Sequence, residues 1–116
     1  MKKIYYLSTC STCKEILKDI GANKKGFVLQ DIKTEKITPA QLDEMKKKAG
    51  SYEALFSRRA IKYKELGLKD KNLGEKDFRK LILGEYTFLK RPVVMLNDKI
   101  FAGSEKKTVE DLKNTL

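Results

Sequence analysis

The first third of the chain alternates two apolar runs with one helical pattern. Residues 4–7 (IYYL) form a short apolar run that predicts a buried strand, and residues 26–32 (GFVLQDI) predict a second strand. Between them, apolar residues recur at helical spacing over residues 13–20, and the pattern stops at Gly21. Because a strand, a helix and a strand in this order need a crossover connection, we expect the two strands to be parallel.

The middle of the chain, residues 38–90, carries helical patterns. Residues 38–50 (TPAQLDEMKKKAG) begin with Thr38 as the expected N-cap, followed by proline, with glutamine three residues after the cap. Residues 51–67 predict one or two further helices, and residues 74–86 predict another. This block therefore looks like a helical insertion between two sheet-forming segments.

The end of the chain predicts a hairpin and a last helix. Residues 91–96 (RPVVML) predict a strand, residues 97–98 a turn, and residues 99–103 (KIFAG) the returning antiparallel strand. Residues 108–116 predict a terminal helix with Thr108 as its cap and with an acidic residue, Asp111, in its first turn.

The expected fold is α/β, with a mixed four-stranded sheet and a helical insertion. We expect residues 1–116 to form a single domain, in which about 1–37 and 91–116 make the sheet-containing core and about 38–90 the insertion.

Composition narrows the classes of function. The chain has 26 lysines and arginines against 16 acidic residues, a net charge of +10. Because the lysines are interleaved with acids along helical faces, they indicate solvated surfaces rather than a direct nucleic-acid interface. No apolar run approaches the roughly 18 residues of a membrane span, and the opening residues do not form a signal peptide. We therefore expect a cytoplasmic protein without a membrane segment.

The sequence CSTC places Cys10 and Cys13 where the first strand gives way to the first helix. The free N–H groups and positive dipole end of that helix would stabilise a Cys10 thiolate, with the N–H groups of Ser11, Thr12 and Cys13 facing the charge. Cys13 lies almost one turn later and could resolve a mixed disulfide formed on Cys10. Cys13 could also be a buried filler, because free cysteine packs as a small hydrophobe. A zinc site is not expected, since the chain has neither histidine nor a third cysteine.

A second candidate feature is Arg91–Pro92 at the head of the third strand. Proline at this position removes a backbone donor and suits the start of a strand. CxxC after a strand and before a helix is typical of thioredoxin-like proteins, and these carry a cis-proline beside the cysteines. We expect a cis bond here, the alternative being an ordinary trans-proline that opens a strand.

Taken together, CSTC, SRRAIKYKELGL, RPVVML and AGSE, in this order and spacing, resemble the ArsC/Spx family of arsenate-reductase-like proteins. The resemblance covers essentially the whole chain. It implies a thioredoxin-like, or glutaredoxin-like, fold with a helical subdomain and a thiol-disulfide oxidoreductase activity. The electron donor would be glutathione, glutaredoxin or thioredoxin, and no bound cofactor or metal is implied.

The resemblance also assigns expected roles to residues. Cys10 matches the nucleophile of the arsenate reductases, and Arg91 matches one of the three arginines that hold their oxyanion. Arg59 matches an arginine of the Spx-like members, although it could instead be a solvated residue of the insertion. The third arginine should fall near Ala102 and is absent. We therefore expect arsenate reduction to be weak, because losing one guanidinium weakens the binding of an oxyanion.

The alternative is an Spx-like redox-sensing transcription regulator that binds the carboxyl-terminal domain of the α-subunit of RNA polymerase. A glycine comparable to Gly50 belongs to that contact in the Spx-like members, but its alignment here slips by one residue, and we expect Gly50 to be a helix C-cap instead. The sequence alone does not choose between enzyme and regulator. It also leaves open the physiological substrate, the electron donor and the oligomeric state.

Overall fold

A computed structural model describes residues 2–116. The chain divides into two compact units, Met1–Lys36 with Arg91–Leu116, and Ile37–Lys90. The first unit contains the strands and two helices, whose bounds are β1 Lys2–Tyr6, α1 Ser11–Asp19, β2 Val28–Asp31, β3 Val93–Leu96, β4 Lys99–Ala102 and α5 Lys106–Thr115.

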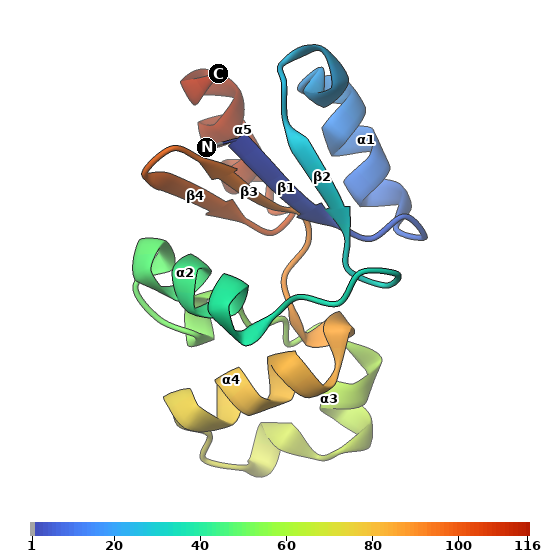
Figure 1. Ribbon diagram of the computed structural model, residues 1–116. Helices are drawn as coiled ribbons and strands as arrows, with labels where there is room; N and C mark the ends of the chain where they lie inside the picture. The colour runs from blue at the N-terminus through green and yellow to red at the C-terminus, as the bar shows by residue number, and fades with distance from the viewer. Residues whose placement is uncertain (1) are drawn as a thin grey trace. The chain divides into compact units, whose positions relative to one another are not determined.

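The four strands form one mixed sheet in the order β2-β1-β3-β4 (Figure 1). Strand β1 pairs in parallel with β2, with Tyr5 opposite Gln30, and antiparallel with β3, with Tyr5 opposite Val93. Strands β3 and β4 pair antiparallel across a turn in which Asn97 has a φ of 58°. The parallel pair and the closing hairpin expected from the sequence are therefore confirmed.

One face of the sheet packs against residues of the α1 and α5 segments. Ile4 of β1 and Val94 of β3 form a buried cluster with Ile20, which follows α1, and with Leu112 of α5. Because side chains alternate along a strand, Ile4 and Val94 turn the same face of their strands toward these helices. This cluster fixes α1 beside the sheet and so fixes the place of the cysteines at its amino end.

Helix α5 differs from its expected start. It begins at Lys106 rather than near Thr108, and Glu105, its N-cap, makes no side-chain capping hydrogen bond. The first turn closes through the Val109 N–H on the Glu105 carbonyl, 3.0 Å away, so the turn before Thr108 is already helical. Asp111 consequently lies inside the helix and not in its first turn. Burial of Leu112, rather than a threonine cap, holds this helix against the sheet.

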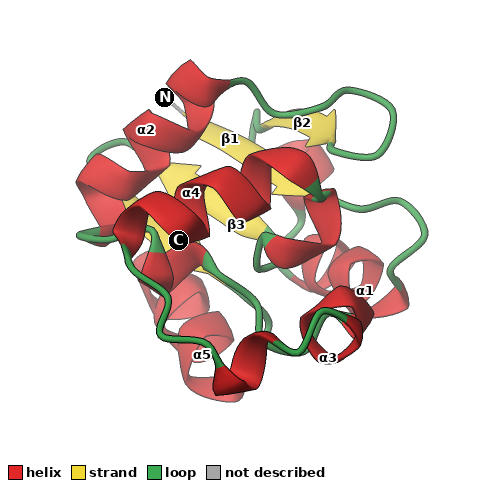
Figure 2. Ribbon diagram, turned by 90° about the horizontal axis from the view of Figure 1, so that it is seen from below, coloured by secondary structure: helices red, strands yellow, loops and turns green. Residues whose placement is uncertain are grey.

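The second unit is helical (Figure 2), with α2 at Pro39–Ala49, α3 at Ile61–Glu65 and α4 at Glu75–Gly84. The expected capping box is confirmed, since Thr38 Oγ1 accepts from the Gln41 N–H at 3.1 Å and Gln41 Oε1 accepts from the Thr38 N–H at 3.0 Å. Gly50 ends α2 with a φ of 95°. Residues 51–67 hold only a 3₁₀ turn and the short α3, which is less helix than their pattern predicts.

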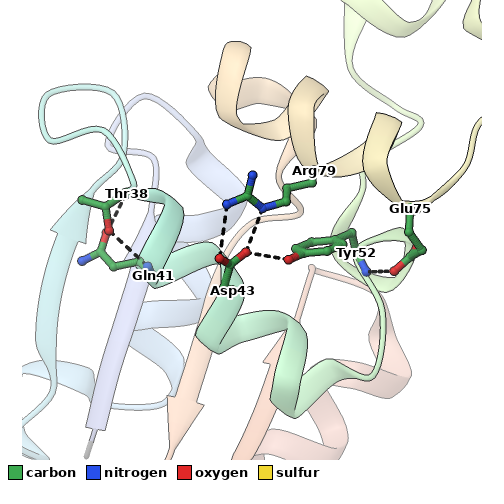
Figure 3. A network of polar contacts seen from close by, with 6 residues as sticks. All are labelled: Thr38, Gln41, Asp43, Tyr52, Glu75 and Arg79. Atoms are coloured by element: carbon green, nitrogen blue, oxygen red, sulfur yellow. Dashed lines mark hydrogen bonds and ion pairs between the residues drawn. The ribbon is translucent and has the colours of Figure 1, made fainter.

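An aromatic cluster and a polar network hold the second unit together. The Phe56 ring lies with its centroid 4.9 Å from that of Phe78 and 5.0 Å from that of Phe88. At the surface, Asp43 of α2 accepts two hydrogen bonds from the Arg79 guanidinium of α4, at 2.9 and 3.2 Å, and a third from the Tyr52 hydroxyl (Figure 3). The network ties α4 to α2 without a buried charge.

Candidate active site at the amino end of α1

Cys10 is the N-cap of α1, as the sequence predicts. Its backbone is extended, with a φ of −96° and a ψ of 111°, and its carbonyl accepts the first helical hydrogen bond from the Lys14 N–H at 3.2 Å. The Cys10 N–H donates to the Leu7 carbonyl at 3.0 Å, which closes a tight turn between β1 and α1. The side chain is partly exposed, so the sulfur sits at the helix tip and within reach of a reagent.

The surroundings of Cys10 favour its thiolate. Burial opposes ionisation, but hydrogen bonds from the Cys13 N–H and the Cys13 thiol, the positive charge of Arg91 and the Thr12 N–H together lower the pKa of Cys10. Free backbone donors at a helix amino end and a nearby guanidinium both stabilise a negative charge on sulfur. Ser11, the first residue of α1, is exposed beside them.

Cys13 has the opposite character. It is fully buried, and burial, the hydrogen bond that it makes with Cys10 and the negative charge on Cys10 raise its pKa to about 12. Both cysteines are free thiols in the structure. The pair therefore consists of one accessible, acidic thiol and one buried thiol that stays neutral while its neighbour is charged.

Arg91 and Pro92 bring the hairpin to the same place. The Arg91–Pro92 peptide bond is cis, as expected. The charge of Arg91 helps to lower the pKa of Cys10 and offsets a small part of the effects that raise the pKa of Cys13. Pro92 is buried, and its carbonyl accepts from the Gly103 N–H at 2.9 Å, which joins the start of β3 to the end of β4. The role of this pair in binding a substrate stays a prediction.

The adjacent arginines Arg58 and Arg59 of the helical unit have different surroundings. Arg58 forms an ion pair with Glu53 at 2.8 Å and lies over the Phe56 and Phe78 rings, 5.9 and 5.6 Å from their centroids. Arg59 is exposed just before α3, and its N–H donates to Ser57 Oγ at 3.4 Å. Arg58 thus has a structural role within its own unit. A role for Arg59 in binding an anion stays a prediction.

Sequence reasoning missed Asp31 at the end of β2. Its Oδ1 accepts from the Ser8 N–H at 3.5 Å and from the Lys33 N–H at 3.1 Å, and bonding to Ser8 is the largest cause of the lowered pKa of Asp31. Ser8 lies in the turn that leads to Cys10. The expected parallel pairing of β1 with β2 could have identified Asp31, because parallel pairing brings the carboxyl ends of both strands, and the residues that follow them, to one edge of the sheet.

Two further observations concern metal binding and membrane-spanning helices. Among residues 2–116, no three histidine, cysteine, aspartate or glutamate side chains gather as a metal site would require. Within the same range, no helix combines the length and apolar character needed to cross a membrane.

The φ of 95° at Gly50, whose N–H donates to the Lys46 carbonyl, accounts for this glycine as a helix C-cap. A contact with RNA polymerase stays a prediction.

Comparison with solved structures gives the same fold. An arsenate reductase from Vibrio cholerae has 19% identity and a TM-score of 0.79, with 99% of this chain and 97% of that chain covered. SACOL0876 from Staphylococcus aureus has 26% identity and a TM-score of 0.76, with 96% and 97% covered. An arsenate reductase (ArsC) related protein from Brucella melitensis has 23% identity and a TM-score of 0.72, with 95% and 92% covered. The expected thioredoxin-like sheet is thereby confirmed.

The sequence itself was compared with curated proteins and with family models. No curated protein matches it. The model of the ArsC family matches residues 5–112, a range that runs from β1 through the cysteine pair and the helical unit into α5. Since this match spans nearly all of the chain and the fold agrees with it, the protein belongs to the ArsC family.

Proposed function

We propose that the chain is a thiol-disulfide oxidoreductase of the ArsC kind, with Cys10 as nucleophile and Cys13 as resolving thiol. One observation carries this proposal: the pKa of Cys10 is lowered while that of Cys13 is raised to about 12. A thiolate is the attacking species in disulfide exchange, and a neutral thiol beside it is kept for the second step. Membership of the ArsC family supports a thiol-based, reductase-like function.

The reaction would proceed in two displacements. The Cys10 thiolate attacks one sulfur of a substrate disulfide, forming a mixed disulfide and expelling the second substrate sulfur as a thiolate. Cys13 then loses its proton and attacks Cys10 Sγ, which releases the first substrate sulfur. The substrate has gained two electrons, and the chain holds a Cys10–Cys13 disulfide. An external thiol reductant, either glutathione, glutaredoxin or thioredoxin, would restore the dithiol.

The other residues that the sequence assigns to the site would position an anionic substrate. Arg91 already acts electrostatically on both sulfurs, so it is the first candidate for holding a carboxylate or oxyanion beside them. The exposed amino end of α1, with Ser11 and Thr12, would supply backbone donors. Pro92 would shape the adjacent surface, and Arg59 would add a second guanidinium. Arsenate should be a poor substrate, because Ala102 stands where the third arginine is expected.

The test combines trapping with turnover. The Cys13→Ser variant should accumulate a mixed disulfide with a model disulfide substrate, visible as an added mass on intact protein, while wild type passes on to the internal disulfide. Cys10→Ser should lose at least about a thousandfold in rate, because the nucleophile is gone. A reduction potential near the thioredoxin value of about −270 mV would fit a reductase.

Two results would contradict the proposal. One is equal reactivity of Cys10→Ser and wild type toward the disulfide. The other is redox-dependent capture of the carboxyl-terminal domain of the α-subunit of RNA polymerase by a chain that shows no turnover with any thiol donor, since this would favour the regulator. Arsenate turnover equal to that of a dedicated reductase would overturn the expectation drawn from Ala102.

A further inference from the structure

A cavity of about 410 Å³ lies at the carboxyl end of α1. Three lysines line it, Lys14 and Lys18 of α1 and Lys24 of the 3₁₀ turn that follows, together with Leu17 and Asn23. Its volume falls within the range of about 300–1,000 Å³ that is usual for ligand pockets. The lining offers cationic groups, one side-chain amide and the apolar side chains of Leu17 and Ala22, so it suits an anionic ligand with some apolar surface.

The charge of this cavity is not neutralised locally. None of its lining residues is acidic, and its three lysines are exposed and form no ion pair within 4.0 Å among residues 2–116. The nearest acidic residues of the helix, Glu15 and Asp19, do not line the cavity. The Asp19 carboxylate lies 4.0 Å from the Lys113 ammonium of α5. This ion pair directs the Asp19 charge toward α5.

Lys14 and Lys18 form a stripe on α1 that starts about one turn after Cys10, the N-cap of the helix. Their spacing of four residues places their side chains along one side of the helix. At a rise of 1.5 Å per residue they lie about 6 and 12 Å along the axis from Cys10. Leu17, seven residues after Cys10, belongs to the same side. A chain bonded to Cys10 Sγ could therefore run along this stripe into the cavity.

We propose that this lysine-lined cavity binds an acidic segment of the protein whose disulfide Cys10 attacks, a step that rests on the function proposed above. Two to four extended residues span about 7–14 Å, which matches the distance from Cys10 to Lys18. Acidic side chains on that segment would meet Lys14 and Lys18, and an apolar residue between them would meet Leu17. The cavity thus selects the substrate protein, while Cys10 and Cys13 carry out the exchange.

A nucleic acid fits the cavity less well. Single-stranded nucleic acids bind through aromatic side chains on which bases stack, in addition to cations. The cavity lining contains no aromatic residue. An acidic peptide needs only the cations and the apolar contact that the cavity provides.

The test uses two matched peptides, each closed by one disulfide, that differ only in carrying three glutamates or three glutamines beside it. Single-turnover reduction by the full chain should be faster for the acidic peptide. In Lys14→Glu/Lys18→Glu that preference should fall by about twofold to thirtyfold, the range expected for two exposed charge pairs. The matched control is Lys76→Glu/Lys80→Glu, which reverses two exposed lysines at the same spacing on α4. It should keep the wild-type preference.

Two further arms separate this inference from the proposed function. A neutral disulfide, 2-hydroxyethyl disulfide, should be reduced at the same rate, within about twofold, by wild type and both charge-reversed variants. A cysteine-free acidic peptide should shift the NMR amide signals of Lys14, Lys18 and Asn23 whether or not the chain is an oxidoreductase. If the chain reduced no disulfide, the proposed oxidoreductase function would be contradicted, but the NMR experiment would still test whether the cavity binds an acidic peptide.

The inference is overturned by any of three results. The first is equal reduction of the acidic and neutral peptides by wild type. The second is an equal loss of preference in the α4 control, which would mean that only net charge matters. The third is stronger displacement of those amide signals by a single-stranded oligonucleotide than by the acidic peptide.

Discussion

The buried thiol of Cys13 donates a hydrogen bond to the sulfur of Cys10, and this contact moves the pKa values of the two cysteines in opposite directions. The bond stabilises the Cys10 thiolate and so lowers the pKa of Cys10. For the same reason it holds the proton on Cys13, whose pKa burial has already raised. Once Cys10 enters a mixed disulfide, its charge is lost and two of the causes that raise the Cys13 pKa disappear. In the mechanism proposed above, bond formation at Cys10 would therefore make Cys13 easier to deprotonate for the second displacement.

The two displacements should show different pH dependence. The rate of mixed-disulfide formation should rise with pH and reach its plateau at a lower pH than for an ordinary thiol, because the pKa of Cys10 is lowered. The rate of resolution should still rise with pH in the alkaline range, because burial of Cys13 remains after Cys10 has reacted. Stopped-flow single turnovers at a series of pH values, with a disulfide substrate that reports on each step, would separate the two rates.

The matched variant for this prediction is Cys13→Ala, which removes the hydrogen bond to Cys10. The pKa of Cys10, followed by thiolate absorbance near 240 nm, should then rise relative to wild type. An unchanged Cys10 pKa in this variant would mean that the contact between the two sulfurs does not control reactivity.

Arg91 should act on the cysteines through its charge. Arg91→Gln should raise the pKa of Cys10, because the positive charge that favours the thiolate is removed. Alkylation of Cys10 by iodoacetamide should consequently shift to higher pH, whereas Arg91→Lys should retain part of the effect. Arg58→Gln is a suitable control, since Arg58 is paired with Glu53 in the helical unit. A shift of equal size in Arg58→Gln would contradict an effect specific to Arg91.

Local patterns predicted the parts of the structure that are set by neighbouring residues. The capping box of Thr38 and Gln41 and the end of α2 at Gly50 follow from short-range hydrogen bonding. Cys10 was placed correctly for the same reason, because a strand that runs into a helix leaves its N-cap at the junction. The mixed sheet followed from connection lengths alone.

Tertiary packing accounts for most of what sequence patterns did not predict. Helix α5 begins before Thr108, because the Val109 N–H already bonds to the Glu105 carbonyl without any side-chain cap. The proton donor to Cys10 could not be identified either, since it depends on the orientation of the Cys13 side chain. Asp31 was missed because its partner Ser8 is 23 residues away in the sequence.

Asp31 should order the turn that carries Cys10. In Asp31→Asn the charge that the Ser8 and Lys33 N–H groups contact is lost, so both amides should exchange with solvent faster, measured by NMR hydrogen exchange. The change should remain local, because Asp31 lies at a partly exposed strand end. Asp98→Asn, in the exposed β3–β4 turn, serves as the control. Equal exchange of the Ser8 amide in wild type and Asp31→Asn would contradict an ordering role.

Asp43 should make the stability of the chain depend on pH in acid. Hydrogen bonds from Arg79 and Tyr52 lower the pKa of Asp43 to about 2, from an ordinary value of 3.8. The unfolded chain therefore takes up a proton on Asp43 at a higher pH than the folded chain does. The stabilisation is fully present above about pH 4 and is lost as the pH falls toward about 2.

Urea unfolding at several pH values between 2 and 7 would measure this effect. Asp43→Asn should be less stable than wild type at pH 7, and the two stabilities should converge as the pH approaches 2. Other carboxylates titrate in the same range, so the informative quantity is the difference between the two proteins at each pH. The same comparison between aspartate and asparagine at position 43, made in the Arg79→Gln variant, measures how much of the effect depends on Arg79. There the difference should shrink, because the guanidinium that holds the Asp43 pKa low is absent, and an undiminished difference would exclude Arg79 as its main cause.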